Sequence, residues 1–151
     1  MALITASAAI SFHGKLEEQA AKFYEDLARN EKYVVGKETF LAFAKENKKH
    51  GAMVLTAYRQ VITDAMEACF AFTNVNESDY TFSTDLPEGA SYSDALKVAM
   101  NVEEQIYKFC VDAAECSKGL LADVPQAFER LVIKKAKRKQ ILKSLIDKAA
   151  A

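Results

Sequence analysis

The chain has 151 residues, of which 50% are hydrophobic and 27% charged, with only five glycines and two prolines. This composition excludes a disordered chain and fits a single globular domain over residues 1–151. The formal net charge of −1 gives the chain no overall electrostatic bias toward nucleic acid or a membrane, so neither is expected as a partner.

The cysteines and the N-terminus indicate where the protein resides. Cys69, Cys110 and Cys116 include no C-x-x-C pair, and a sparse, odd set is typical of a reducing compartment rather than of a disulfide framework. The apolar run within residues 1–12 has no basic flank and is too short to span a bilayer. We therefore expect a cytoplasmic protein.

The first half of the chain predicts two helices. Apolar residues recur with helical spacing over residues 11–28 and again from 37 to about 70, with Gly36 in the polar turn between them. Residues 74–91 are rich in Asn, Ser, Thr, Asp, Pro and Gly, which predicts a long connection without helix.

The second half predicts two further helices. Ser91 and Asp94 form the pattern of a capping box, which opens a helix. Gly119 stands where that helix is expected to stop, and Asp123 begins another that runs toward residue 148. The result is an all-α four-helix bundle made of two helical hairpins and a long crossover, which is the topology of ferritin-like folds.

The two predicted hairpins also repeat in sequence. The run EEQAAKF at residues 17–23 corresponds to EEQIYKF at residues 103–109, and Phe40 corresponds to Phe128. Duplicated hairpins that pack together relate their positions by a pseudo-twofold axis. Residues at the middle of the four inward helix faces are therefore expected to meet at the centre of the bundle.

The inward faces, traced by their helical period, are apolar at both ends and polar at the middle. Buried polar groups are costly unless they are paired or bind a metal, so a polar centre needs an explanation. The residues predicted to converge there are Glu17, Asn47, His50, Glu103, Lys135 and Arg138.

These positions resemble the metal-site motifs of the rubrerythrin family of ferritin-like di-iron proteins. In that family, the first and third helices each carry a Glu, and the second and fourth each carry Glu-x-x-His. The resemblance implies that Glu17, His50 and Glu103 are residual metal-ligand positions. The residues Asn47, Lys135 and Arg138 stand where the family has Glu, Glu and His. The family's rubredoxin-like domain, with its paired C-x-x-C motifs, has no counterpart in this chain.

The substitutions on the fourth helix change the chemistry of the centre. Lys135 and Arg138 are donors without a lone pair for a metal. Two carboxylates and two basic side chains sum to zero charge without any metal, so we expect Lys135 and Arg138 to neutralise Glu17 and Glu103. An Arg–carboxylate pair in such a site can be bidentate. This hypothesis predicts a protein without a cofactor and with a structural or interaction role.

Two other hypotheses remain open. Long basic side chains can also reach out of a helix face to solvent. In that case one iron, manganese or zinc ion could be held by Glu17, His50 and Glu103, with Glu46 or water completing the shell, for peroxide or oxygen chemistry. Glu46 is otherwise interpreted as a solvated residue and His50 as a core histidine. The third hypothesis is a small-ligand binder that uses the polar centre.

Some features are interpreted without a functional role. His13 lies about one turn before Glu17 and could approach the same centre, but it is interpreted as a helix-start residue. Tyr24 is interpreted as a packing residue. The basic cluster over residues 130–148 is interpreted as a solvated helix face, because it surrounds the helix and includes no aromatic side chain. From the family resemblance we expect a homodimer, and the sequence identifies no protein partner.

Overall fold

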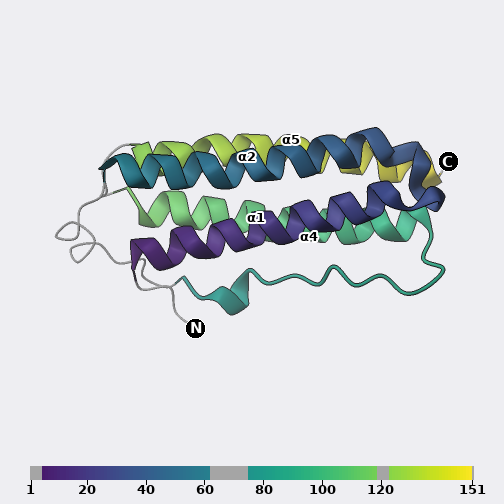
Figure 1. The fold of residues 1–151 in the computed structure, drawn as a ribbon, viewed down its shortest axis with the longest axis horizontal. Coiled ribbons are helices and arrows are strands. Elements are labelled where there is room, and N and C mark those ends of the chain that lie inside the picture. Colours follow the sequence, from purple (N-terminus) through teal and green to yellow (C-terminus); the bar gives the residue numbers. More distant parts are fainter. Residues whose placement is uncertain (1–4, 62–74, 119–122, 151) are drawn as a thin grey trace.

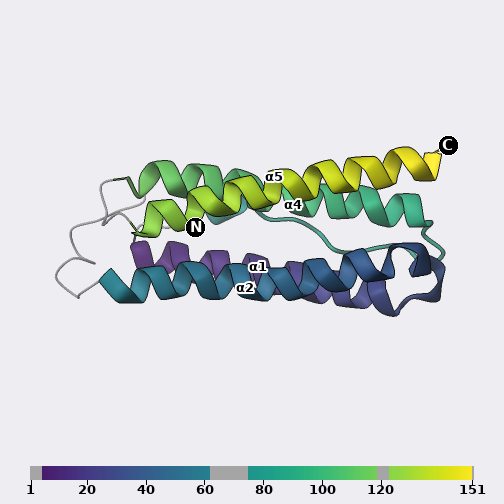
Figure 2. The same ribbon diagram turned by 90° about the horizontal axis from the view of Figure 1, so that it is seen from above.

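The computed structural model describes residues 5–61, 75–118 and 123–150. Over these ranges the chain forms an all-α four-helix bundle, as predicted (Figure 1). Its helices are α1 (Ala6–Arg29), α2 (Lys37–Val61), α4 (Tyr92–Cys116) and α5 (Asp123–Ala150). Figure 2 shows the α1/α2 hairpin and the α4/α5 hairpin as two rows that face each other.

Helix α1 begins earlier than the predicted residue 11, because Thr5 caps it. The Thr5 hydroxyl accepts a hydrogen bond from the Ala8 amide at 3.1 Å, which satisfies one of the free donors of the first turn. Ala6, Ala9 and Ile10 are buried in the added turns. The predicted bounds missed this start because the first turn contains no strongly apolar stripe.

A short 3-10 helix, η1 (Glu31–Gly36), connects α1 to α2. Gly36 ends it and is buried rather than in an open polar turn. A Cβ at this position would lie 2.9 Å from the rings of Phe40 and Tyr92. Glycine is therefore required here by close packing, which lets the two helices turn tightly against α4.

Three sequence predictions fall outside the described residues. Helix α2 is described to Val61, so its predicted extension to about residue 70 lies beyond this limit. Cys69 and Gly119 also lie outside the described ranges.

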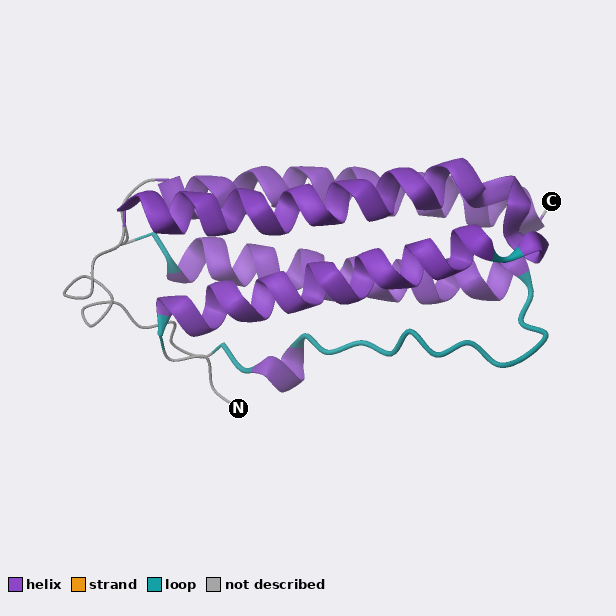
Figure 3. Cartoon of the chain, viewed as in Figure 1, coloured by secondary structure: helices purple, strands orange, loops and turns teal. Residues whose placement is uncertain are grey.

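The described part of the connection between the hairpins, residues 75–91, runs along α1 and α4, where Figure 3 draws its loops in teal. It includes a short 3-10 helix, η2 (Glu77–Asp79). The hydroxyl of Tyr80 donates to Asp112 of α4 at 2.7 Å, and Gln19 of α1 donates to the Phe82 carbonyl at 3.3 Å. These bonds hold the long connection against both hairpins.

The capping box at the start of α4 is present as predicted. The Asp94 amide donates to the Ser91 hydroxyl at 3.0 Å, and the Ser91 amide donates to the Asp94 carboxylate at 3.1 Å. This reciprocal pair satisfies two donors at the helix N-terminus and fixes the point where the connection ends.

The core contains two groups of aromatic side chains, one toward each end of the bundle. The ring of Phe109 lies 5.4 Å from that of Phe12 and 6.0 Å from that of Phe128, measured between ring centroids. Near the other end, Tyr24 lies 5.3 Å from Phe43 and 6.1 Å from Phe40. The predicted polar residues lie between these two groups, so aromatic side chains cover the polar layer toward both ends of the bundle.

Gly36→Ala should destabilise the fold. The added methyl would overlap two aromatic rings in a packed corner, and overpacking of this kind costs ~1–3 kcal/mol. Urea unfolding measures the change. Gly14→Ala is the matched control, because a Cβ there meets nothing within 4 Å, and it should raise stability by up to ~1 kcal/mol. Equal effects of the two substitutions would contradict the packing argument.

Candidate functional site

Each of the four long helices contributes to one polar layer at the middle of the bundle. The side chains of this buried centre come from α1 (Glu17), α2 (Asn47 and His50), α4 (Glu103) and α5 (Lys135 and Arg138). All six are at most 2% exposed. The structure therefore brings the six residues of the predicted cluster together, and it places both basic side chains inside the bundle.

Lys135 lies between the two carboxylates. Its Nζ donates to Glu17 Oε1 at 2.7 Å and lies 3.8 Å from Glu103 Oε1. Glu17 is on the first hairpin and Glu103 is on the second, so one ammonium group serves both halves of the molecule. With all three side chains at most 2% exposed, this attraction is little screened by solvent.

Arg138 makes three hydrogen bonds, each to a different group. Its Nη1 donates to Asn47 Oδ1 at 2.9 Å and to Glu103 Oε2 at 3.3 Å, and its Nη2 donates to the Phe43 carbonyl at 2.7 Å. The expectation of a bidentate Arg–carboxylate pair is therefore wrong. A backbone carbonyl of α2 takes the second nitrogen, and the guanidinium lies 4.5 Å from the centre of the Phe43 ring.

Asn47 connects the two ion pairs. Its Nδ2 donates to Glu17 Oε1 at 2.6 Å while its Oδ1 accepts from Arg138. Only a side chain with both a donor and an acceptor can satisfy these neighbours. A glutamate here would bring a third carboxylate beside Glu17, so the amide suits the basic residues on α5.

His13 also belongs to the centre, and its interpretation as a helix-start residue is wrong. It is fully buried, and its Nε2 lies 2.9 Å from Glu17 Oε2. The sequence does contain a signal for this contact. His13 precedes Glu17 by four residues, so both lie on one face of the predicted helix. Because α1 begins at Ala6, His13 lies well inside the helix rather than at its start.

His50 is near the same carboxylate but does not bond to it. Its Nδ1 lies 3.8 Å from Glu17 Oε1, beyond hydrogen-bond distance. Burial is the main cause that lowers the pKa of His50 below its ordinary value. The imidazole is therefore neutral at pH 7, and it adds no charge to the centre.

Tyr24 has a specific bond in addition to its packing. Its hydroxyl donates to Glu103 Oε2 at 2.5 Å. In the sequence repeat Tyr24 corresponds to Cys110, which offers no equivalent hydroxyl to Glu17. His13 supplies the bond at Glu17 instead, so the two glutamates have different partners although their positions are related by the repeat.

Comparison with known proteins identifies the family. The family model called Rubrerythrin matches residues 10–124. The chain belongs to the rubrerythrin family. The match covers α1, α2 and α4 and ends at the start of α5, the helix that supplies Lys135 and Arg138. No curated protein and no solved structure matches the chain significantly. Within the described residues, no helix has the length and apolar character needed to cross a membrane.

The electrostatics of Glu17 differ from those of an isolated buried carboxyl. Burial is the largest single influence and acts to raise its pKa, but the charge of Lys135 and the neighbouring His13 and His50 together outweigh burial. The pKa of Glu17 is therefore held well below its ordinary value, and the group is ionised at neutral pH. Burial, followed by the neighbouring Glu103 carboxylate, raises the pKa of the Tyr24 hydroxyl, which stays protonated as a donor.

The centre does not fit the di-iron site implied by the rubrerythrin resemblance. Lys135 and Arg138 occupy two ligand positions without offering a lone pair, and the Glu17 oxygens already accept from Asn47, Lys135 and His13. Within residues 5–61, 75–118 and 123–150, no group of three or more His, Cys, Asp or Glu residues is arranged to hold a metal ion.

Glu46 lies at the edge of the centre rather than within it. Its side chain is 47% exposed, and its Oε2 is 4.0 Å from Arg138 Nη2. A contact at this distance and exposure contributes little to stability. Glu46 is therefore partly solvated, which is close to its sequence-based interpretation as a solvated residue.

Lys135→Met should be strongly destabilising. It leaves Glu17 and Glu103 buried without the cation between them, and breaking a buried pair in this way costs ~3–5 kcal/mol. Urea unfolding at pH 7 measures the loss. Lys134→Met, at the exposed neighbouring position, is the control and should change stability by less than ~0.5 kcal/mol. A small effect at Lys135 would mean that the ion pair does not exist in solution.

Stability should fall in acid because of Glu17. Its pKa is depressed in the folded state relative to its ordinary value of 4.5, so its contribution is complete above that pH and is lost as the pH falls through the folded pKa. Urea unfolding of the wild type and of Glu17→Gln, from about pH 6 to pH 3, should show a steeper acid decline in the wild type. Parallel curves would contradict this assignment.

Proposed function

We propose that this protein is a non-catalytic member of the rubrerythrin family with a structural or interaction role. In this proposal, built-in cations replace the di-iron centre: Lys135 and Arg138 neutralise Glu17 and Glu103. The observation that carries the proposal is the position of Lys135 Nζ, 2.7 Å from one glutamate and 3.8 Å from the other at 0% exposure.

Charge balance supports this proposal. The formal charges of Glu17, Glu103, Lys135 and Arg138 sum to zero, and the pKa of His50 is lowered. A divalent ion entering this centre would add an uncompensated charge in a dry environment, which is costly. It would also have to displace Lys135 from Glu17. Both the added charge and the bond between Lys135 and Glu17 therefore oppose metal uptake.

The hydrogen bonds support it as well. Catalytic metal sites keep an open coordination position for substrate. Here Tyr24, Asn47, Lys135 and Arg138 direct their donors at the two carboxylates from inside the protein. A filled arrangement of this kind suits a structural centre better than oxygen or peroxide chemistry. A homodimer, expected from the family resemblance, is the simplest interaction role, and sedimentation equilibrium tests it.

Metal content is the decisive measurement. Protein purified without chelator, and then incubated anaerobically with ferrous iron or manganese, should contain far less than one ion per chain by mass spectrometry. Stoichiometric metal that is lost in Glu103→Ala or His50→Ala would overturn the proposal. A rearranged oxidoreductase site using Glu17, His50 and Glu103 would then replace it, to be assayed with peroxide.

A variant that restores the family's ligand types tests whether iron binding can be regained. The triple variant Asn47→Glu, Lys135→Glu and Arg138→His should gain iron binding, because it removes both cations and adds three ligand groups. Circular dichroism in the presence of iron checks that it is folded. The control introduces the same three residue types, two glutamates and one histidine, at exposed sites, with Lys45→Glu, Lys134→Glu and Lys137→His, and should gain none. Equal uptake by both would mean that the buried cations do not govern metal binding.

A further inference from the structure

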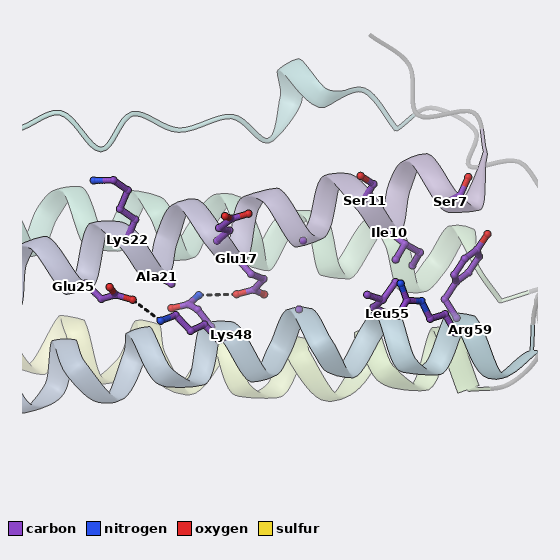
Figure 4. Close-up of a pocket in the computed structure, with 15 residues that line it drawn as sticks. Ser7, Ile10, Ser11, Glu17, Ala21, Lys22, Glu25, Lys48, Leu55 and Arg59 are labelled. Carbon is purple, nitrogen blue, oxygen red and sulfur yellow. Dashed lines mark hydrogen bonds and ion pairs between the residues drawn. The ribbon is translucent and has the colours of Figure 1, made fainter.

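A groove of about 760 Å³ lies along the outer side of the α1/α2 hairpin, on the face shown in Figure 4. Ile10 of α1 and Leu55 of α2 line it from opposite sides, with Ala21 further along. Glu17 and Asn47 lie at its floor, but their polar atoms bond within the centre. The groove therefore offers an apolar surface, and its volume is in the range of small-molecule sites.

Two glycines inside helices make the groove deep. Gly14 of α1 and Gly51 of α2 both line it, and neither has a positive φ. A Cβ at Gly14 would meet nothing within 4 Å, and one at Gly51 would be in ordinary contact with Glu17 at 3.9 Å. Unlike Gly36, they are required by neither packing nor backbone conformation, although glycine weakens a helix interior. Their common effect is to leave the groove open.

The charges at the two ends of the groove differ. At one end, Lys48 Nζ lies 2.8 Å from Glu25 Oε1, and Lys22 Nζ lies 3.0 Å from Asp26 Oδ2, so both cations are paired. At the other end is Arg59 (Figure 4). Its side chain takes part in none of the ion pairs formed by residues that the structure describes. Arg59 is therefore the cation available to a bound anion.

We propose that this groove binds a straight-chain aliphatic carboxylate. Its carboxylate pairs with Arg59, and its chain lies between Ile10 and Leu55 over Gly14 and Gly51. The ten residues of α1 between Ser7 and Glu17 span ~15 Å, which an extended chain of about ten to twelve carbons fills. The acidic side chain of Glu18 at mid-groove repels the head group and sets this direction.

The ligand class follows from charge complementarity. An aliphatic amine would place its cation beside Arg59, and an alcohol would leave Arg59 without a counter-ion. A carboxylate forms a charge-assisted pair with the guanidinium while its chain covers the apolar walls. Ile10, Leu55 and Arg59, which make the proposed contacts with the ligand, are not residues of the buried centre, so binding can be measured apart from the metal content.

Titration calorimetry with decanoate tests this inference, with decanol and decylamine as probes of the head group. Decanoate should bind saturably at one site per chain, and both analogues should bind at least tenfold more weakly. Arg59→Gln should weaken decanoate binding about tenfold. Arg130→Gln, which removes an exposed cation outside the groove, should leave the affinity unchanged.

The glycines separate binding from folding. Gly14→Ala should raise the melting temperature by a few degrees and weaken decanoate binding several-fold, because the methyl enters the groove. Gly14→Leu should abolish binding, and Gly14→Ala decides the question if that variant fails to fold. The inference is overturned if decanoate does not bind saturably, if decanol binds equally well, or if neither Arg59→Gln nor Gly14→Ala changes the affinity. None of these results depends on the metal content of the centre.

Discussion

The structure depends on one ammonium group placed between two carboxylates. Lys135 lies between Glu17 and Glu103 in a layer with aromatic side chains on both sides. The surrounding polar groups follow from this pair. Asn47 and His13 also bond to Glu17, and Arg138 and Tyr24 both bond to Glu103 Oε2. Each group is an acceptable buried residue only because the others are present.

Cations that belong to the chain differ from cations that are bound. A metal centre couples folding to metal supply and to the deprotonation of its ligands. In the proposed arrangement the positive charges arrive with α5, so the centre is complete whenever the four helices pack. In that proposal the rubrerythrin fold is kept without bound ions, and the fold would be separable from the metal chemistry.

The sequence predicted the helices, the crossover and the inward positions of the centre, because these follow from periods and spacings. It did not predict which atoms bond. The second nitrogen of Arg138 bonds to the backbone carbonyl of Phe43, an acceptor that no side-chain pattern reveals. The spacing of His13 and Glu17 allowed His13 to approach the centre, but the predicted helix start at residue 11 favoured a helix-start role. The cap at Thr5 places His13 well inside α1. The groove was not predicted, because it depends on the absence of side chains at Gly14 and Gly51.

The bonds of the centre cross between the hairpins. Lys135 of α5 reaches Glu17 of α1, Arg138 of α5 reaches Asn47 of α2, and Tyr24 of α1 reaches Glu103 of α4. Two apolar hairpin faces could slide past each other by one helical turn at small cost. Such a shift would leave each of these buried polar groups without its hydrogen-bond partner. The polar layer therefore fixes a single register between the two halves of the repeat, which is a gain in uniqueness of the fold rather than in its total stability.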